Sequence, residues 1–187
     1  MCGPGNNGGD GWIVAELARR EGLVPILIEL CDQTALGAGA AAARAEALAA
    51  DVPVTRDLAR LDEADVIVDG LFGIGLTREV TGDFGAAIRA VNACAARSTP
   101  VLALDIPSGL HADTGAVLGS AVRAAVTVTF IGLKRGLVTG AAAAHVGDLV
   151  FDGLGTPASI HAGIAPAARR VDVATRAGLL PRRARHP

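Results

Sequence analysis

Residue types that can bind an anion are concentrated in one short stretch near the start of the chain, between Gly3 and Gly11. Its sequence is GPGNNGGDG, in which five of the nine residues are glycine, and an amphipathic run follows at once. Glycine lets another molecule approach the main chain closely, and a glycine-rich turn that feeds a helix presents free N–H groups to phosphate. The stretch therefore predicts a binding loop, although a tight turn with Asp10 as a helix N-cap would explain part of it. Its spacing is neither the dinucleotide fingerprint G-x-G-x-x-G nor a P-loop.

A second glycine-rich stretch, DGLFGIGLTRE, begins at Asp69 and ends at Glu79. Asp69 closes an apolar run, where a buried carboxylate is costly unless it is paired or binds a metal. The glycines allow close approach of a ligand, and the guanidinium of Arg78 can donate two hydrogen bonds to a phosphate. A strand followed by a turn with a solvated arginine is the alternative interpretation.

Two further motifs carry groups suited to proton transfer. DIPSG, from Asp105 to Gly109, places a carboxylate at a strand end, before a rigid proline and a hydroxyl. That order is typical of an acid or base held on a fixed turn, and an Asx turn is the alternative. Lys134, the only lysine of the chain, lies in TFIGLKRGL beside glycines. The pKa of a lysine shifts readily on burial, whereas the alternative is an ordinary surface cation.

The hydrophobic pattern alternates between apolar runs of strand length and helical segments. Helices are predicted at 12–21, 38–50 and 84–97, one helical turn at 141–144, and strands at 24–30, 52–54, 65–72, 100–105, 125–130 and 147–151. This order predicts an α/β fold with a three-layer, Rossmann-like arrangement and a mostly parallel sheet. Ligands bind beyond the carboxyl ends of such strands, where 69–79, 105–115 and 131–140 would meet. Only Met1 and Cys2 precede the first glycine-rich stretch, so the first strand of the sheet is expected to be missing.

Composition narrows the class of protein. The 187 residues suit one domain, and a net charge of −2 with a pI of about 6.1 gives no electrostatic footprint for nucleic acid or an anionic membrane. The chain shows neither a membrane-spanning apolar run nor a secretory signal, and its three cysteines are widely spaced. Reduced thiols in a cytoplasmic protein are the expectation.

All four motifs resemble those of the NAD(P)H-hydrate epimerase family, also called the YjeF N-terminal domain. GPGNNGGDG resembles the signature loop of the family, 69–79 its second substrate loop, DIPSG its active-site motif, and the Lys134 stretch its F-x-x-x-K-x-G-L segment. The match covers residues 2 to about 155, so 1–155 is interpreted as the epimerase domain, incomplete at its start. Residues 156–187 are interpreted as a tail or linker toward a dehydratase domain, with a disordered terminus as the alternative.

The resemblance implies an isomerase that interconverts the R and S hydrates at C6 of damaged NADH or NADPH, called NADHX and NADPHX. It implies catalytic roles for Asp105 and Lys134, and a potassium ion bound by Asn7, Asp69 and Ser108. It also implies a homodimer, with an ATP- or ADP-dependent dehydratase fused to the chain or acting as a partner. The substrate site implied by the resemblance consists of Asn6, Asn7, Gly8, Gly9, Asp10, Gly73, Ile74, Gly75, Leu76, Thr77, Arg78, Glu79 and Asp105.

Two other functions are weighed against the epimerase. Relatives of this domain also serve as protein-interaction scaffolds, which can lose the acidic and asparagine positions; Asn7, Asp69, Asp105 and Lys134 all remain here, which favours the enzyme. An NAD-dependent dehydrogenase would carry G-x-G-x-x-G after a first strand and an acidic residue at the end of the following strand. Glu29 could be that acidic residue, but the glycine spacing of this chain does not match the fingerprint.

Overall fold

The computed structural model describes residues 1–32 and 36–168 of the chain. It divides into two compact units, Met1–Thr156 and Pro157–Pro187. The described part of the second unit contains one short 3₁₀ turn, Ala158–His161. The tail expected at 156–187 therefore lies outside the described residues from 169 onward. Within the described ranges, none of the helices combines the length and the apolar composition needed to cross a membrane.

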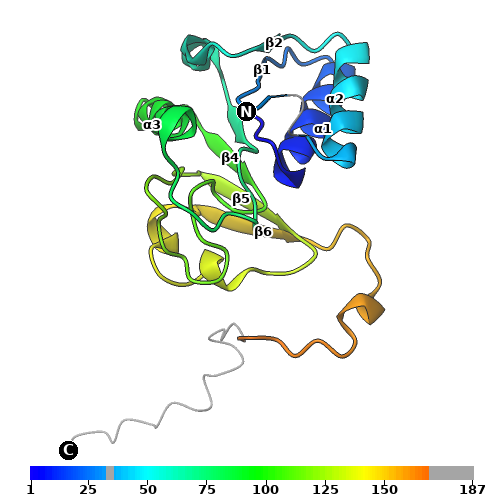
Figure 1. Cartoon of the computed structure of the whole chain (residues 1–187), viewed down its shortest axis with the longest axis vertical. Coiled ribbons are helices and arrows are strands. Elements are labelled where there is room, and N and C mark those ends of the chain that lie inside the picture. The colour runs from blue at the N-terminus through cyan, green and yellow to red at the C-terminus, as the bar shows by residue number, and fades with distance from the viewer. Residues whose placement is uncertain (33–35, 169–187) are drawn as a thin grey trace, which may run out of the picture. The chain divides into compact units, whose positions relative to one another are not determined.

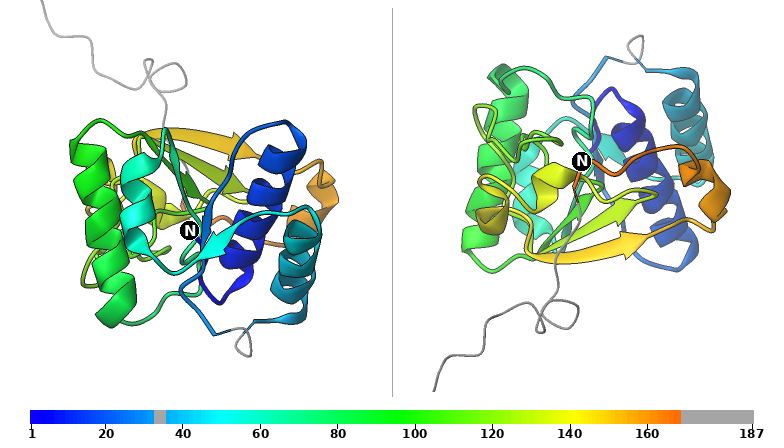
Figure 2. Two further views of the ribbon diagram at one scale, coloured as in Figure 1. Left: turned by 90° about the horizontal axis from the view of Figure 1, so that it is seen from above. Right: turned by 90° about the horizontal axis from the view of Figure 1, so that it is seen from below.

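The first unit has three layers (Figures 1 and 2). A parallel sheet lies in the middle, α1 and α2 pack side by side on one face, and α3 covers the other face. This is the three-layer α/β fold that the alternating pattern predicts. In chain order the elements are α1 (Asn6–Arg20), β1 (Leu27–Ile28), α2 (Ala38–Ala49), β2 (Val54–Thr55), β3 (Ile67–Asp69), α3 (Gly82–Ala96), β4 (Val101–Leu104), β5 (Val126–Phe130) and β6 (Asp148–Asp152).

Residues Met1–Gly3 join two groups of strands into one sheet. The strands pair in the orders β1-β2 and β3-β4-β5-β6, and every pair is parallel. Cys2 forms parallel bridges with both Glu29 and Gly70. The Cys2 amide donates to the Ile28 carbonyl at 2.9 Å, and the Gly70 amide donates to the Met1 carbonyl at 3.0 Å. The segment thus takes the place between β1 and β3 where the sequence led us to expect a missing strand.

A hollow of about 690 Å³, which we call the central slot, lies between β1 and β3. The Met1 ammonium donates to the Val68 carbonyl at 2.8 Å, so Met1 stands at one end of the slot. Side chains and backbone N–H groups alternate in direction along a strand, so residues two positions apart face the same way. Ile26 therefore faces the slot in the same way as Ile28, and Val66 in the same way as Val68. Its walls come from α1, from the approach to β1 and from β3: Met1, Gly11, Val14, Ala15, Ala18, 22–28, Arg60, Leu61 and 63–68.

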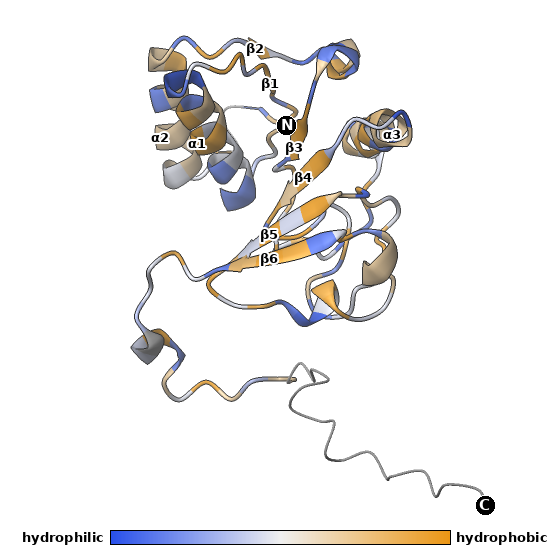
Figure 3. Ribbon diagram, turned by 180° about the vertical axis from the view of Figure 1, so that it is seen from behind, coloured by the Kyte–Doolittle hydropathy of each residue, from blue (hydrophilic) through white to orange (hydrophobic). Residues whose placement is uncertain are grey.

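The core is built mainly from aliphatic side chains. On the α3 face, Ile88 and Val91 of the helix are fully buried against β3 and β4, whose apolar character Figure 3 shows. On the opposite face, Trp12 of α1 packs against Cys2 and against Ala43 and Ala47 of α2. The small alanines let α1 and α2 approach each other closely, which keeps the start of α1 at the sheet.

Several predicted boundaries are wrong. The first helix begins at Asn6 and not at residue 12, so the first glycine-rich stretch is largely helical. The run predicted as a strand at 24–30 is regular only at 27–28, and that at 65–72 only at 67–69. The short strand predicted at 52–54 lies at 54–55. Apolar composition marks which segments are buried, but ladder partners decide how many of their residues are paired.

Candidate active site

The start of α1 forms one wall of the site because glycines let it approach other backbone segments. A Cβ on Gly8 would lie 1.9 Å from the Gly3 carbonyl oxygen, and a Cβ on Gly11 would lie 2.6 Å from the Cys2 sulfur. The binding loop predicted at 3–11 is therefore largely helical, because the residues from Asn6 onward belong to α1. Gly5 caps the helix without a side-chain hydrogen bond, and Asp10 is not the N-cap. The first amides of α1 still lie at the carboxyl edge of the sheet.

Asn7 ties this first turn to the loop after β3. Its side-chain amide donates to the Phe72 carbonyl at 3.0 Å, and its Cβ would lie 3.2 Å from a Cβ on Gly73. The side-chain oxygen Oδ1 of Asn7 is buried and has no hydrogen-bond partner among the described residues. A buried acceptor without a partner costs about 1–3 kcal/mol, so this oxygen is a place where a ligand would be stabilised.

Asp69 and Ser108 form a buried pair next to Asn7. The Ser108 hydroxyl donates to Asp69 Oδ1 at 2.6 Å, and the Ser108 amide donates to Asp69 Oδ2 at 2.8 Å. The Ser108 hydroxyl in turn accepts from the Phe72 amide at 2.8 Å, so Ser108 and Asn7 both bond to the main chain of Phe72, and Asp69 joins them through Ser108. Burial raises the pKa of Asp69, and the hydrogen bonds from Ser108 and Leu71 oppose that rise.

Among the residues that the structure describes, no ion pair neutralises this cluster of oxygens, although the charge of the N-terminal ammonium opposes the rise in the pKa of Asp69 that burial causes. The cluster offers the amide oxygen of Asn7, the carboxylate of Asp69 and the hydroxyl of Ser108. Such ligands suit a hard cation, not a transition metal. In the described ranges, no group of three or more His, Cys, Asp and Glu side chains could hold a metal ion. The orphaned oxygen of Asn7 and the buried charge of Asp69 fit a monovalent ion.

Asp105 and Lys134 form an ion pair above the ends of β4 and β5. Each side chain is 15% exposed, so the pair is partly shielded from water. The Phe130 amide donates to Asp105 Oδ1 at 3.2 Å, and the Lys134 ammonium donates to the Phe130 carbonyl at 2.8 Å and to Thr129 Oγ1 at 3.1 Å. Asp105 itself has a positive φ of 65°, a conformation that is costly outside glycine and typical of functional turns.

Asp10 lies one turn into α1 and is half-buried. It makes no hydrogen bond and no ion pair with any residue that the structure describes. Burial raises the pKa of Asp10, and the charge of Asp105 raises it further. Asp10 lies on α1, which packs against β4, and Asp105 directly follows β4, so the two residues come to this edge of the sheet from a helix and from a strand end.

The loop at 73–79 is the least constrained part of the predicted site. Ile74 is 62% exposed, while Leu76 packs into the core. Thr77, Arg78 and Glu79 are exposed, and within the described ranges none of them forms an ion pair. The structure places this loop beside Asn7 at Gly73, but it does not bring the guanidinium of Arg78 onto the Asp69 cluster.

Sequence reasoning missed the groups that hold the two clusters together. Thr129 is fully buried and binds Lys134, and the main chain of Phe72 joins Asn7 to Ser108. A threonine at an inward position of an apolar strand was the available signal for Thr129, since a buried hydroxyl needs a partner. Nothing in the sequence marks the Phe72 main chain.

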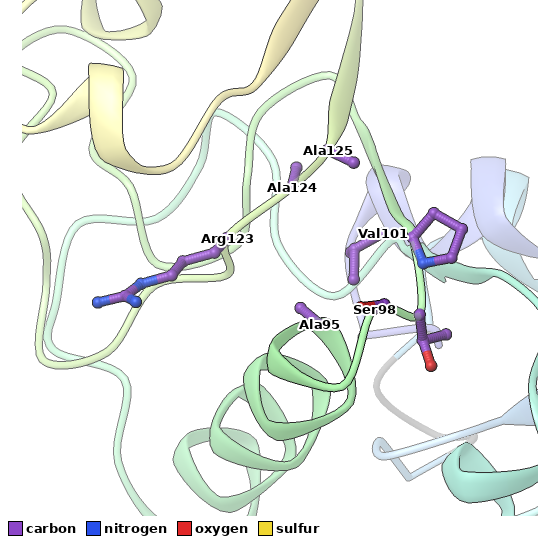
Figure 4. A pocket seen from close by; sticks show the side chains of 8 residues that line it. Ala95, Ser98, Val101, Arg123, Ala124 and Ala125 are labelled. Atoms are coloured by element: carbon purple, nitrogen blue, oxygen red, sulfur yellow. The ribbon is translucent and has the colours of Figure 1, made fainter.

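A second hollow, of about 350 Å³, lies at the opposite edge of the sheet (Figure 4). It opens where β4 and β5 begin, and its lining includes Ala95 of α3, Val101 of β4 and Arg123. The clusters of Asp69 and of Asp105 lie at the other ends of these strands, so this hollow is separate from the candidate site.

Comparisons with known proteins point in the same direction. A family model described as "YjeF-related protein N-terminus" matches residues 1–136. The bifunctional NAD(P)H-hydrate repair enzyme Nnr of Coxiella burnetii is 42% identical over 98% of this chain, which spans 37% of that enzyme. The NAD(P)H-hydrate epimerase of Limosilactobacillus fermentum is 41% identical over 83% of this chain and 74% of its own length. The crystal structure of yeast ynu0 has the same fold, with a TM-score of 0.65, 22% identity, and coverage of 80% of this chain and 62% of the yeast chain.

Proposed function

The chain belongs to the family of YjeF-related protein N-termini, and from that premise we propose that it is an NAD(P)H-hydrate epimerase. The observation that carries the proposal is the ion pair of Asp105 and Lys134 at the carboxyl edge of the sheet, beside the first turn of α1. An acid or base next to a helix N-terminus suits a substrate with both a reacting ring and phosphates. The substrate would be the hydrate of NADH or NADPH, the reacting molecule and not a bound cofactor.

The reaction changes the configuration at C6 of the hydrated nicotinamide ring. That carbon carries a hydroxyl and is bonded to the ring nitrogen, so the hydroxyl leaves as water once it receives a proton. Asp105 is the group we assign to this proton transfer, because its carboxyl is held by the Phe130 amide and by Lys134. Lys134 and Thr129 both contact the Asp105 carboxyl and each other, and so fix its direction.

Phosphates and ribose of the substrate are proposed to lie along the first turn of α1 and the loop at 73–79. The Gly8 amide lies within that first turn, where the positive end of the helix dipole favours an anion, whereas the Gly9 amide already donates to the Gly5 carbonyl at 3.2 Å. Arg78 is exposed and unpaired within the described ranges, so it is free to turn toward a phosphate. The remaining residues of the implied site, from Asn6 to Asp10 and from Gly73 to Glu79, would surround the dinucleotide.

We also propose that Asn7, Asp69 and Ser108 hold a potassium ion. Bound there, the ion would supply a fixed positive charge that neutralises the Asp69 carboxylate and joins three loops. The protein contributes the buried oxygen of Asn7, which has no other partner among the described residues. The test is thermal unfolding in KCl against tetramethylammonium chloride at equal ionic strength. We expect a higher melting temperature in KCl, and an equal response of the Asn7→Ala variant would contradict the site.

A coupled assay tests the activity directly. R-NAD(P)HX is mixed with a dehydratase that consumes only the S form, and the protein should accelerate loss of the R form. Asp105→Asn should lose about 10²–10⁴-fold in rate, as expected for removal of an acid or base. Asp51→Asn, an exposed aspartate after α2, is the matched control and should keep its full rate. A folded Asp105→Asn protein with normal activity would overturn the assignment.

The place of the enzyme in a repair sequence follows from the same proposal. The bifunctional relatives suggest that the S form is consumed by a dehydratase, fused to this chain or acting as a separate partner that uses ATP or ADP. A homodimer in the cytoplasm is part of this proposal. Gel filtration with light scattering would show whether the chain forms a dimer. The measurement is made at protein concentrations above and below a value on the order of 10 μM.

A further inference from the structure

Within residues 1–32 and 36–168, the carboxyl group of Asp10 has neither a cation nor a hydrogen-bond donor as a partner. It is half-buried on α1, and α1 lies against β4, whose last residue directly precedes Asp105. Asp105, in contrast, is bound by Lys134 and by the Phe130 amide. Two carboxyl groups therefore reach the same edge from different directions, one from the helix layer and one from the side of β5.

Their environments differ in a way that separates acid from base. The carboxyl of Asp105 is bound by the ammonium of Lys134 and by the Phe130 amide. The side chain of Asp10 has no such partner among the described residues, and burial and the charge of Asp105 raise its pKa. Pairs of titratable groups with opposed environments are the usual arrangement for an acid and a base that act on one substrate. A half-buried carboxyl with no partner is otherwise a cost to the fold, which a structural role would not require.

Epimerisation needs such a pair. On one face of the ring, a carboxylic acid gives its proton to the C6 hydroxyl, the C6–O bond breaks, and the oxygen leaves as water while the nitrogen lone pair forms the N1=C6 double bond. On the other face, a water oxygen bonds to C6, its proton passes to a carboxylate, and the nitrogen regains its lone pair. One carboxyl loses a proton and the other gains one, so the step balances without oxidant or reductant.

We propose that Asp10 is a second catalytic residue of this site, and that it serves the face of C6 opposite to the face that Asp105 serves. The inference rests on the proposed epimerase function, which it deepens by assigning one carboxyl group to each face. It gives Asp10 a direct part in proton transfer, in addition to any contact with the dinucleotide.

Isotope exchange separates the two faces. Each epimer is incubated in H₂¹⁸O with the enzyme, and mass spectrometry follows both the label in the hydroxyl and the R-to-S conversion, with the uncatalysed rate subtracted. The wild-type protein should convert and label both epimers. Asp10→Asn should lose roughly 10²–10⁴-fold in conversion but still label one epimer, because Asp105 can release and return water on its own face. Asp105→Asn should label only the opposite epimer.

Asp83→Asn, an acidic residue in the first turn of α3, is the matched control and should behave as wild type. Thermal unfolding of each variant shows that it is folded, and Asp10→Glu should recover part of the conversion. If folded Asp10→Asn loses labelling equally for both epimers, Asp10 has a binding role and the proposal is overturned. Normal conversion by Asp10→Asn would also overturn the proposal. A wild-type protein that converts neither epimer would refute the epimerase function itself. If the wild-type protein is active, the comparison of the variants with it tests the role of Asp10.

Discussion

Gly8→Ala should destabilise the protein and disable the site, although alanine is the better helix former. Gly8 lies inside α1, where replacing glycine by alanine normally stabilises a helix by about 0.5–1 kcal/mol. Here the new Cβ would lie 1.9 Å from the Gly3 carbonyl oxygen, 2.8 Å from its carbon and 3.0 Å from its nitrogen. All three are backbone atoms of the segment that joins β1 to β3, so no flexible side chain can move aside.

Either α1 or the segment Met1–Gly3 must therefore shift by about 1 Å to restore van der Waals contact. Overpacking of this kind costs about 1–3 kcal/mol, which outweighs the gain in helix propensity. The net loss of ~1 kcal/mol would lower the melting temperature by roughly 2–4 °C for a domain of this size. The same shift moves Asn7 away from Phe72, and a misplacement of ~1 Å at a site can cost about a hundredfold in rate.

Gly39→Ala is the matched control, because Gly39 lies in the first turn of α2 and a Cβ there meets no atom within 4 Å. We expect this variant to keep its rate and to melt at the same temperature or up to roughly 3 °C higher. Differential scanning calorimetry and the coupled epimerase assay measure both effects. A Gly8→Ala protein as stable and active as Gly39→Ala would show that the packing argument is wrong.

Three further outcomes are expected. Ser108→Ala removes the hydroxyl that joins Asp69 to the Phe72 amide, so urea unfolding should show a loss of about 1–3 kcal/mol for each buried group left unpaired, and Ser108→Thr should recover part of it. Burial raises the pKa of the Cys2 thiol from 9.0 to about 11. The buried neutral thiol therefore contributes its full share to the free energy of unfolding below pH 9, and that share is lost as the pH rises from there through about 11. Alkylation at pH 8 followed by mass mapping should leave Cys2 unmodified until the protein unfolds. An engineered extension of four to six apolar residues before Met1 should occupy the central slot as a strand and raise the melting temperature, while an extension of equal length made of glycine and serine should not.

Much of this protein could be predicted from the sequence because the signals are local. Alternating apolar runs and helical segments predicted the α/β fold, and the comparisons with relatives and the yeast structure agree with it. The spacing within DIPSG and within the Lys134 stretch singled out residues that the structure joins in an ion pair. Each motif consists of neighbours in the chain, so its residue types and spacing can be recognised without knowing which distant segments it contacts.

The tertiary structure decided what depends on residues far apart in sequence. Whether the first glycines form a loop or a helix depends on how closely Gly8 and Gly11 approach Met1–Gly3, and that contact favours the helix. The lengths of β1 and β3 depend on the partners that each strand finds. The unpaired oxygen of Asn7, and the contact of α1, which carries Asp10, with β4, which precedes Asp105, arise from packing between elements that the chain separates by many residues. Composition encodes which groups are costly to bury, but only the assembled sheet edge determines which of them meet.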